Sequence, residues 1–284
     1  MSDRTILGGR PSSKCGGRPP GAGGAVAESR DVLARAASEP DAVVHYGPGP
    51  EQLADLRFPD RGPAPLLVLL HGGFWRPEWD RRHTRPMADG LAAAGFAVAT
   101  PEYARTGHGG WSRTAADVAR AVAALPDLVA AVRPDVVHAA GAVLVGHSAG
   151  GQLTLWCASS GLPAPYVGVV AIAPVADLTA AHRLDLDAGA VAALLGGSPE
   201  EVPDRYAAAD PCRLTPPALP VVVVHGARDE QVPLELSQRY AAQAGADLRV
   251  LPSAGHFDLI DPNSPSWLHV LESISDLCYR PPPR

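Results

Sequence analysis

Short apolar runs recur along the chain, and most are followed by a segment in which apolar residues have helical spacing. The clearest runs are 66–70, 96–100, 143–145, 167–173, 221–224 and 248–251. Continuous runs of this length are typical of parallel strands buried on both faces. Their alternation with helical segments predicts an α/β fold with a mostly parallel central sheet and helices on both faces. Two earlier stretches, 43–47 and 53–58, are joined by a Gly-Pro-Gly-Pro turn and predict short strands, the second antiparallel and half-buried.

Two segments fall outside this pattern. Residues 1–25 are rich in Gly, Pro, Ser and Arg and bury too little apolar surface to offset ordering, so we expect a disordered tail. Residues 26–284 are then expected to form a single domain. Residues 177–215 combine helical Leu/Ala spacing with Gly196-Gly197 and several prolines, which predicts a short insert rather than a second domain.

A nucleophile motif follows the run at 143–145. Gly146-His147-Ser148-Ala149-Gly150 matches G-x-S-x-G, and residues 152–158 after it have helical apolar spacing. Strand, tight turn and helix is the context in which this motif exposes a serine hydroxyl above the edge of a sheet. The helix that begins there directs its dipole and free N–H groups at any anion that forms. A chance glycine-rich turn is the alternative, and the flanking elements count against it.

Two further residues complete a catalytic pattern. Ser148, Asp229 and His256 each lie just past the end of a predicted strand. A serine hydroxyl needs a histidine to take its proton and return it to the leaving group, and a carboxylate to fix the imidazole tautomer. This order and placement predict a catalytic triad. Glu230 is an alternative to Asp229, which we prefer because it begins the turn directly after its strand.

A glycine-rich loop follows the run at 66–70. His71-Gly72-Gly73-Phe74-Trp75 places two glycines where the backbone can turn sharply and expose its N–H groups. We expect His71 to brace this loop by hydrogen bonding. A glycine turn with a buried aromatic pair is the alternative interpretation.

These motifs, with Asp229-Glu230-Gln231-Val232-Pro233 and Gly255-His256-Phe257, resemble the α/β-hydrolase superfamily from about residue 43 to the end. The resemblance implies the α/β-hydrolase fold with a short lid at 177–215. It also implies that the oxyanion hole is formed by the N–H groups of Gly72, Gly73 and Ala149.

Within the superfamily, His-Gly-Gly-aromatic-Trp resembles the kynurenine formamidase (arylformamidase) branch. The hormone-sensitive-lipase branch usually has a third glycine where this chain has Phe74. The resemblance implies hydrolysis of an N-formyl arylamine such as N-formylkynurenine, with release of formate.

Aromatic residues near these loops suggest how such a substrate would be held. Formate is the smallest acyl group, so Phe74 and Trp75 are expected to narrow the acyl side of the pocket. Tyr103 and Trp111 are expected to stack on an aromatic leaving group, and core packing is the alternative for each of the four. The candidates for binding a substrate carboxylate are Arg76, Arg105 and His108.

Bulk composition excludes several classes of function. The chain has 284 residues, 46% of them hydrophobic and 19% charged, and a net charge of −6. These values predict a soluble globular protein and argue against binding to nucleic acid or an anionic membrane. No apolar run approaches the roughly 18 residues needed to span a bilayer.

The cysteines and histidines show no metal-binding spacing, so we expect no metal and no cofactor. Scattered cysteines and the absence of a signal peptide of the usual anatomy predict the reducing cytoplasm. The expected partner is a small-molecule substrate. The oligomeric state is left open, with a homodimer as one option.

The favoured hypothesis is a serine hydrolase that cleaves an aryl formamide through an acyl-enzyme intermediate. A general short-chain carboxylesterase is the alternative. A peptidase-like hydrolase is less favoured because the insert is short, and a non-catalytic binder because all three triad residues are present.

Overall fold

The computed structural model describes residues 29–134, 137–163 and 165–279. The predicted tail at 1–25 lies outside these residues, so its disorder stays a prediction. Within the described part of the chain, no helix combines the length and apolarity required to cross a membrane.

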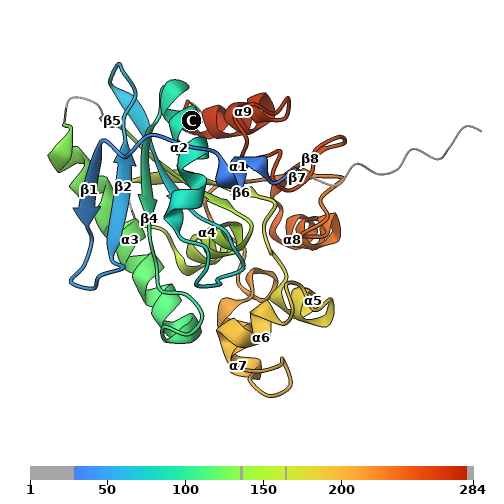
Figure 1. Cartoon of the computed structure of the whole chain (residues 1–284). Helices are drawn as coiled ribbons and strands as arrows, with labels where there is room; N and C mark the ends of the chain where they lie inside the picture. Colours follow the sequence, from blue (N-terminus) through green and yellow to red (C-terminus); the bar gives the residue numbers. More distant parts are fainter. Residues whose placement is uncertain (1–28, 135–136, 164, 280–284) are drawn as a thin grey trace, which may run out of the picture.

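One eight-stranded sheet, in the order β1-β2-β4-β3-β5-β6-β7-β8, organises the described residues (Figure 1). The β1–β2 and β2–β4 pairs are antiparallel, and all the other pairs are parallel. The predicted mostly parallel sheet is confirmed. The strands are β1 (Ala42–His45), β2 (Leu53–Arg57), β3 (Ala64–Leu70), β4 (Ala97–Pro101), β5 (Val137–His147), β6 (Tyr166–Ile172), β7 (Val221–Gly226) and β8 (Asp247–Leu251).

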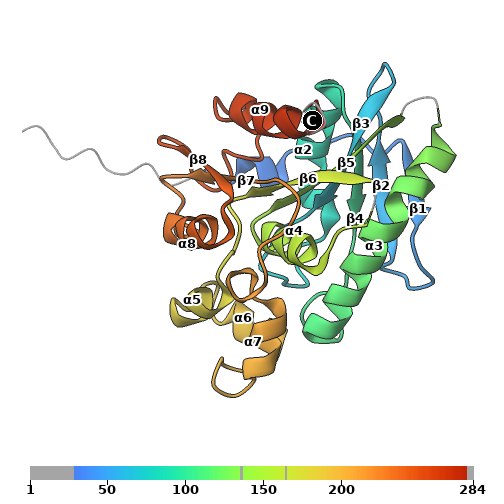
Figure 2. The ribbon, with the colours of Figure 1, turned by 180° about the vertical axis from the view of Figure 1, so that it is seen from behind.

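Helices cover both faces of the sheet (Figures 1 and 2). Leu66, Val68 and Leu70 of β3 belong to one core with α3, α4 and α8, whereas Leu67 and Leu69 belong to a second core with α1, α2 and α9. Because side chains alternate along a strand, a continuous apolar run fills both cores, as predicted. The helices are α1 (Asp31–Ala34), α2 (Arg85–Ala93), α3 (Gly110–Val132), α4 (Ala149–Ser160), α8 (Leu234–Ala244) and α9 (Trp267–Cys278), with a 3-10 turn η1 (Arg81–Thr84) before α2.

The predicted insert at 177–215 is helical. Between β6 and β7 the chain forms α5 (Leu178–Arg183), α6 (Ala190–Leu195), α7 (Pro203–Ala209) and the 3-10 turn η2 (Pro211–Arg213), which lie together beyond the sheet (Figure 2). Asp177 caps α5 by accepting a hydrogen bond from Ala180 N at 2.7 Å. Buried Asp210 accepts from Leu178 N and Thr179 N, each at 3.0 Å, and so attaches the end of the insert to its beginning.

Candidate active site

Ser148 occupies the turn between β5 and α4, with φ 57° and ψ −118°. A positive φ is strained for a residue with a side chain and persists only where its surroundings enforce it. Ser148 N donates to Ile172 O at 2.8 Å, and Ser148 O accepts from Gln152 N at 3.1 Å and Val175 N at 3.2 Å. The turn is therefore held by the following helix and by the end of the neighbouring strand β6.

Two glycines permit the close packing that this turn requires. A Cβ atom on Gly146 would lie 2.2 Å from Thr154 Oγ1, and one on Gly150 would lie 2.1 Å from Leu70 O and 2.4 Å from His71 O. Real Cβ atoms do not approach other atoms so closely. The spacing in G-x-S-x-G therefore allows α4 to begin directly against β5 and β3.

Asp229 and His256 form a short hydrogen bond. His256 Nδ1 lies 2.7 Å from Asp229 Oδ2, which is also 3.2 Å from His225 Nε2. The other carboxylate oxygen, Oδ1, accepts from Gln231 N at 2.8 Å and Val232 N at 2.7 Å. The carboxylate is therefore fixed on both sides, and its neighbour in the sequence, the alternative Glu230, is exposed.

The charge of Asp229 follows from these contacts. Burial alone would raise the pKa of Asp229, but the hydrogen bonds from His225 and His256 and from Val232 N hold it well below its usual range. The carboxylate is ionised at neutral pH and accepts the Nδ1 proton of His256. Nε2 of His256 is then free to act as a base.

Ser148 and His256, each 3% exposed, line the same cavity of about 90 Å³. The cavity lies at the carboxyl ends of the parallel strands, where α/β folds place their ligand sites. Its other lining residues come from the segment before and within α1, from the loop after β3 with η1, from the insert, and from positions next to the predicted triad. They are Arg30, Leu33, Gly73, Phe74, Trp79, His83, His147, Asp187, Gln231 and Phe257.

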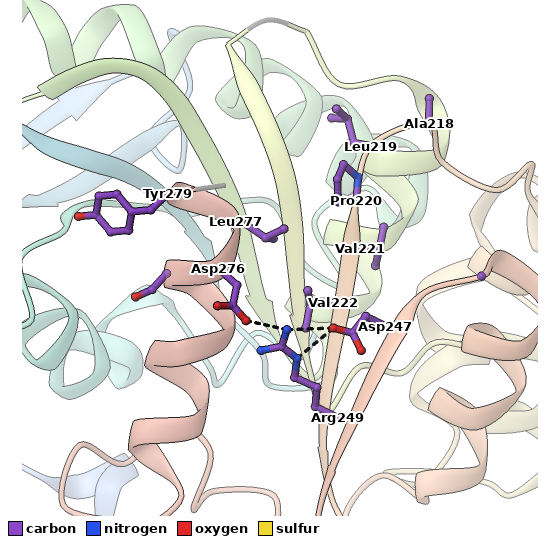
Figure 3. A pocket seen from close by; sticks show the side chains of 12 residues that line it. Ala218, Leu219, Pro220, Val221, Val222, Asp247, Arg249, Asp276, Leu277 and Tyr279 are labelled. Carbon is purple, nitrogen blue, oxygen red and sulfur yellow. Dashed lines mark hydrogen bonds and ion pairs between the residues drawn. The ribbon is translucent and has the colours of Figure 1, made fainter. Parts of the chain in front are cut away.

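A larger hollow of about 880 Å³ lies at the opposite end of the strands, between the starts of β7 and β8 and the last turn of α9 (Figure 3). Arg249 projects into it and forms ion pairs with Asp247 at 2.9 Å and Asp276 at 2.8 Å. None of the predicted site residues lines this hollow. We therefore take the smaller cavity as the candidate active site.

The loop after β3 has an unusual backbone. Gly73, Phe74 and Trp75 have φ values of 99°, 48° and 56° in succession. Gly73 and Phe74 line the cavity, and their N–H groups meet no acceptor among the described residues. Ala149 is the first residue of α4, so its N–H has no partner within the helix. Gly72 does not line the cavity, but a Cβ on it would lie 3.0 Å from Ser148 Cβ, so its expected part in the oxyanion hole stays a prediction.

His71 braces this loop, in agreement with the role we expected for it. Its Nδ1 lies 2.9 Å from Gly72 O and its Nε2 lies 3.0 Å from Glu102 Oε1. Tyr103 stacks on the imidazole with the ring centroids 4.2 Å apart, and its hydroxyl donates to His71 O at 2.6 Å. The first residue of the loop is thus fixed through both its side chain and its carbonyl.

Glu102 is a buried anion that the sequence predictions missed. It accepts from Arg81 N at 3.0 Å and from Tyr103 N at 3.1 Å, and the guanidinium of Arg105 lies 3.7 Å away. Burial opposes ionisation, but His71, the Arg81 N–H and Arg105 together lower the pKa of Glu102 to about 2. Glu102 could have been found from the sequence, because it directly follows a buried strand. The same feature identified Asp229.

Of the four residues predicted to contact the substrate, one lines the cavity and three do not. Phe74 lines the cavity, but Trp75, Tyr103 and Trp111 do not. Trp75 is 1% exposed and lies in the core, Tyr103 is fully buried, and Trp111 packs edge-on against Trp156 with centroids 5.2 Å apart. For these three residues the substrate-contact prediction is corrected in favour of core packing.

The three candidates for binding a substrate carboxylate also lie elsewhere. Arg76 donates to Asp187 at 2.8 Å, which joins the loop after β3 to the insert. Arg105 and His108 both bond to Glu51 at 3.1 Å. None of the three lines the cavity, and each already has an acidic partner.

Several residues that line the cavity were not predicted from the sequence. Trp79 and His83 pack edge-on, with centroids 5.4 Å apart, and His83 Nδ1 lies 2.5 Å from Asp80 O. Burial, reinforced by the nearby His71, lowers the pKa of His83 to about 4. His83 is therefore neutral at pH 7. The remaining unpredicted contacts include Arg30, far from the motifs in sequence, and Gln231 and Phe257, which lie beside the triad residues.

No cluster of three or more His, Cys, Asp or Glu side chains suited to a metal ion occurs in the described ranges. The cysteines in those ranges, Cys157, Cys212 and Cys278, are free thiols.

Comparison with known proteins finds two similar sequences that are both named esterases. Esterase LipQ of Mycobacterium tuberculosis is 29% identical over 244 residues, covering 76% of this chain and 57% of LipQ. Esterase LipC of the same organism is 28% identical over 255 residues, covering 77% of this chain and 60% of LipC. The chain thus spans somewhat more than half the length of these curated relatives.

Among solved structures, Esterase B from Lactobacillus rhamnosis superposes with a TM-score of 0.68 at 20% identity, covering 87% of this chain and 90% of that one. This likeness supports the α/β-hydrolase fold implied by the motifs and by the sheet order. The BD-FAE family model matches residues 55–243, well over half of the chain and most of its sheet. The chain belongs to the BD-FAE family and has the α/β-hydrolase fold.

Proposed function

We propose that this protein is a serine esterase that cleaves short-chain esters through an acyl-enzyme intermediate on Ser148. The observation that carries the proposal is the cavity that both strained Ser148 and Asp229-bound His256 line. The esterase names of both curated relatives support the same reaction class.

The mechanism follows from the positions of these groups. His256 Nε2 takes the Ser148 hydroxyl proton as Oγ attacks the ester carbonyl, and Asp229 stabilises the resulting imidazolium. The tetrahedral oxyanion accepts hydrogen bonds from the N–H groups of Ala149, Gly73 and Phe74. His256 then protonates the departing alcohol. Water, deprotonated by the same histidine, attacks the acyl-enzyme and releases the acid.

The cavity restricts the size of the substrate. The cavity is about 90 Å³, well below the roughly 300–1,000 Å³ of pockets that enclose a drug-sized ligand, so the buried part of the substrate is small. Formyl, acetyl and propionyl groups are of this size. The same observation favours a second candidate, an N-formyl arylamine such as N-formylkynurenine, whose acyl group is the smallest of all.

Active-site labelling tests the mechanism. A fluorophosphonate probe should label the wild-type protein rapidly and a Ser148→Ala variant not at all. Ser160→Ala, at the exposed end of the same helix, is the matched control and should label like the wild type. Folded wild-type protein that resists labelling would contradict the proposal.

Substrate choice is tested by comparing p-nitrophenyl acetate with N-formyl-L-kynurenine. Ser148-dependent turnover of the acetate alone supports the esterase. A clear preference for the formamide in kcat/KM supports the second candidate instead.

A further inference from the structure

The wall of the candidate active site holds a cation that pairs with no acidic residue in the part of the chain that the structure describes. Arg30, just before α1, is exposed and lines the cavity. Its Nη2 donates to Gln231 Oε1 at 2.7 Å, and its guanidinium carbon lies 5.4 Å from the centroid of the Phe257 ring. These contacts hold the guanidinium at the cavity but leave most of its five N–H donors unused by them.

Neighbouring arginines differ from Arg30 in this respect. Arg35 pairs with Asp261 and Arg76 pairs with Asp187, whereas Arg30 forms no ion pair with any residue that the structure describes. Asp187, the acidic residue of the cavity wall, is therefore already compensated by Arg76. The charges of Arg30 and Asp187 are equal and opposite, but Asp187 is paired with Arg76, so Arg30 is the wall cation that no described carboxylate pairs.

The position of Arg30 indicates which part of the substrate it meets. Gln231 and Phe257, which hold Arg30, follow Asp229 closely and His256 directly in the sequence. Since His256 must reach the leaving-group oxygen to protonate it, the leaving group lies on this side of the cavity. The acyl group lies toward the loop that carries Gly73 and Phe74.

We propose that this site selects esters whose leaving group carries a carboxylate, and that Arg30 binds this carboxylate. Arginine suits the task because its planar fork matches a carboxylate and is always charged. The inference rests on the proposed esterase function and names its substrate class.

Paired substrates test the inference. We would measure kcat/KM for 4-acetoxybenzoate and for its neutral methyl ester with the wild type and with Arg30→Gln. The anionic-to-neutral ratio should fall about 3- to 10-fold in Arg30→Gln, mainly through KM, because an exposed charge-assisted contact contributes to binding in this range. Arg30→Lys should retain part of the preference, and added salt should weaken it.

The matched control is Arg249→Gln, which removes the same charge from the hollow at the opposite end of the strands. Its ratio should equal that of the wild type. If Arg30→Gln keeps the wild-type ratio while the neutral ester is still hydrolysed, the Arg30 inference is overturned and the esterase proposal stands. If Ser148 resists labelling and the neutral ester is not hydrolysed, both fall.

Discussion

The G-x-S-x-G motif is expected to need a glycine at position 150 so that α4 can pack against the backbone of β3 and the loop after it. Replacing Gly150 by alanine tests this expectation. Gly150 lies in the first turn of α4 and has no positive φ, so alanine suits its backbone and would favour the helix by about 1 kcal/mol. Against this, the new Cβ would lie 2.1 Å from Leu70 O and 2.4 Å from His71 O. Both are backbone atoms of β3 and its loop, so neither rotates away.

The size of the effect follows from these distances. An ordinary contact begins near 3.4 Å, so α4 must move by more than 1 Å relative to β3. Overpacking of this severity costs about 3 kcal/mol, which exceeds the gain in helix propensity and leaves a net loss of about 2 kcal/mol. In a chain of this size Tm should fall by roughly 4–8 °C. Because α4 carries the Ala149 N–H and β3 leads to Gly73, kcat/KM should fall about 100-fold.

Calorimetry and ester hydrolysis measure the two effects separately. Gly245→Ala is the matched control, because Gly245 ends α8 with φ 67° and nothing lies within 4 Å of its added Cβ. That variant should lose about 1 kcal/mol to backbone strain yet keep wild-type kcat/KM. If Gly150→Ala keeps both the wild-type Tm and the wild-type kcat/KM, the steric argument is refuted.

Two further changes address the buried carboxylates. Asp229→Asn should lower kcat for p-nitrophenyl acetate at least about 10³-fold with little change in KM, because an amide no longer fixes the His256 tautomer. Steady-state kinetics measure both constants, and a wild-type kcat in this variant would contradict the proposed role of Asp229. Glu102 has a pKa of about 2 in the fold, below its unfolded value, so it stabilises the protein above about pH 4.5 and this contribution is lost as pH falls toward 2. Glu102→Gln should therefore lower the free energy of unfolding in urea at pH 7 by about 3 kcal/mol, and the difference from wild type should narrow between pH 5 and 3; a difference independent of pH would contradict this reasoning.

The sheet could be predicted from local pattern because its strands are buried on both faces. Runs such as 66–70 and 221–224 have no polar positions, and the structure places each between two parallel neighbours in the sheet. Residues that directly follow such strands gather at one edge, whatever their separation in sequence. For this reason Asp229 and His256 could be paired before the structure was known, although 26 residues separate them.

The walls of the cavity could not be predicted in the same way. Trp75 and Trp79 lie four residues apart in one loop, yet Trp75 is buried in the core and Trp79 lines the cavity. The direction of each side chain depends on consecutive positive φ values at 73–75, which the amino-acid types alone do not reveal. Arg30 reaches the site because the segment before α1 lies beside the loop between β7 and α8, a contact across 201 residues of sequence.

The loop after β3 is anchored differently at its two ends. At its start, His71 and Glu102 are bonded to each other with almost no exposure to solvent, so separating them would leave an unpaired charge in the core at a cost of several kcal/mol. Beyond the strained residues, Arg76 joins Asp187 of the insert through a partly exposed ion pair, which contributes about 1 kcal/mol or less. The Gly73 and Phe74 N–H groups therefore lie between a buried anchor and a partly exposed one. Removing the Arg76–Asp187 ion pair should disturb this loop less than removing the His71–Glu102 pair.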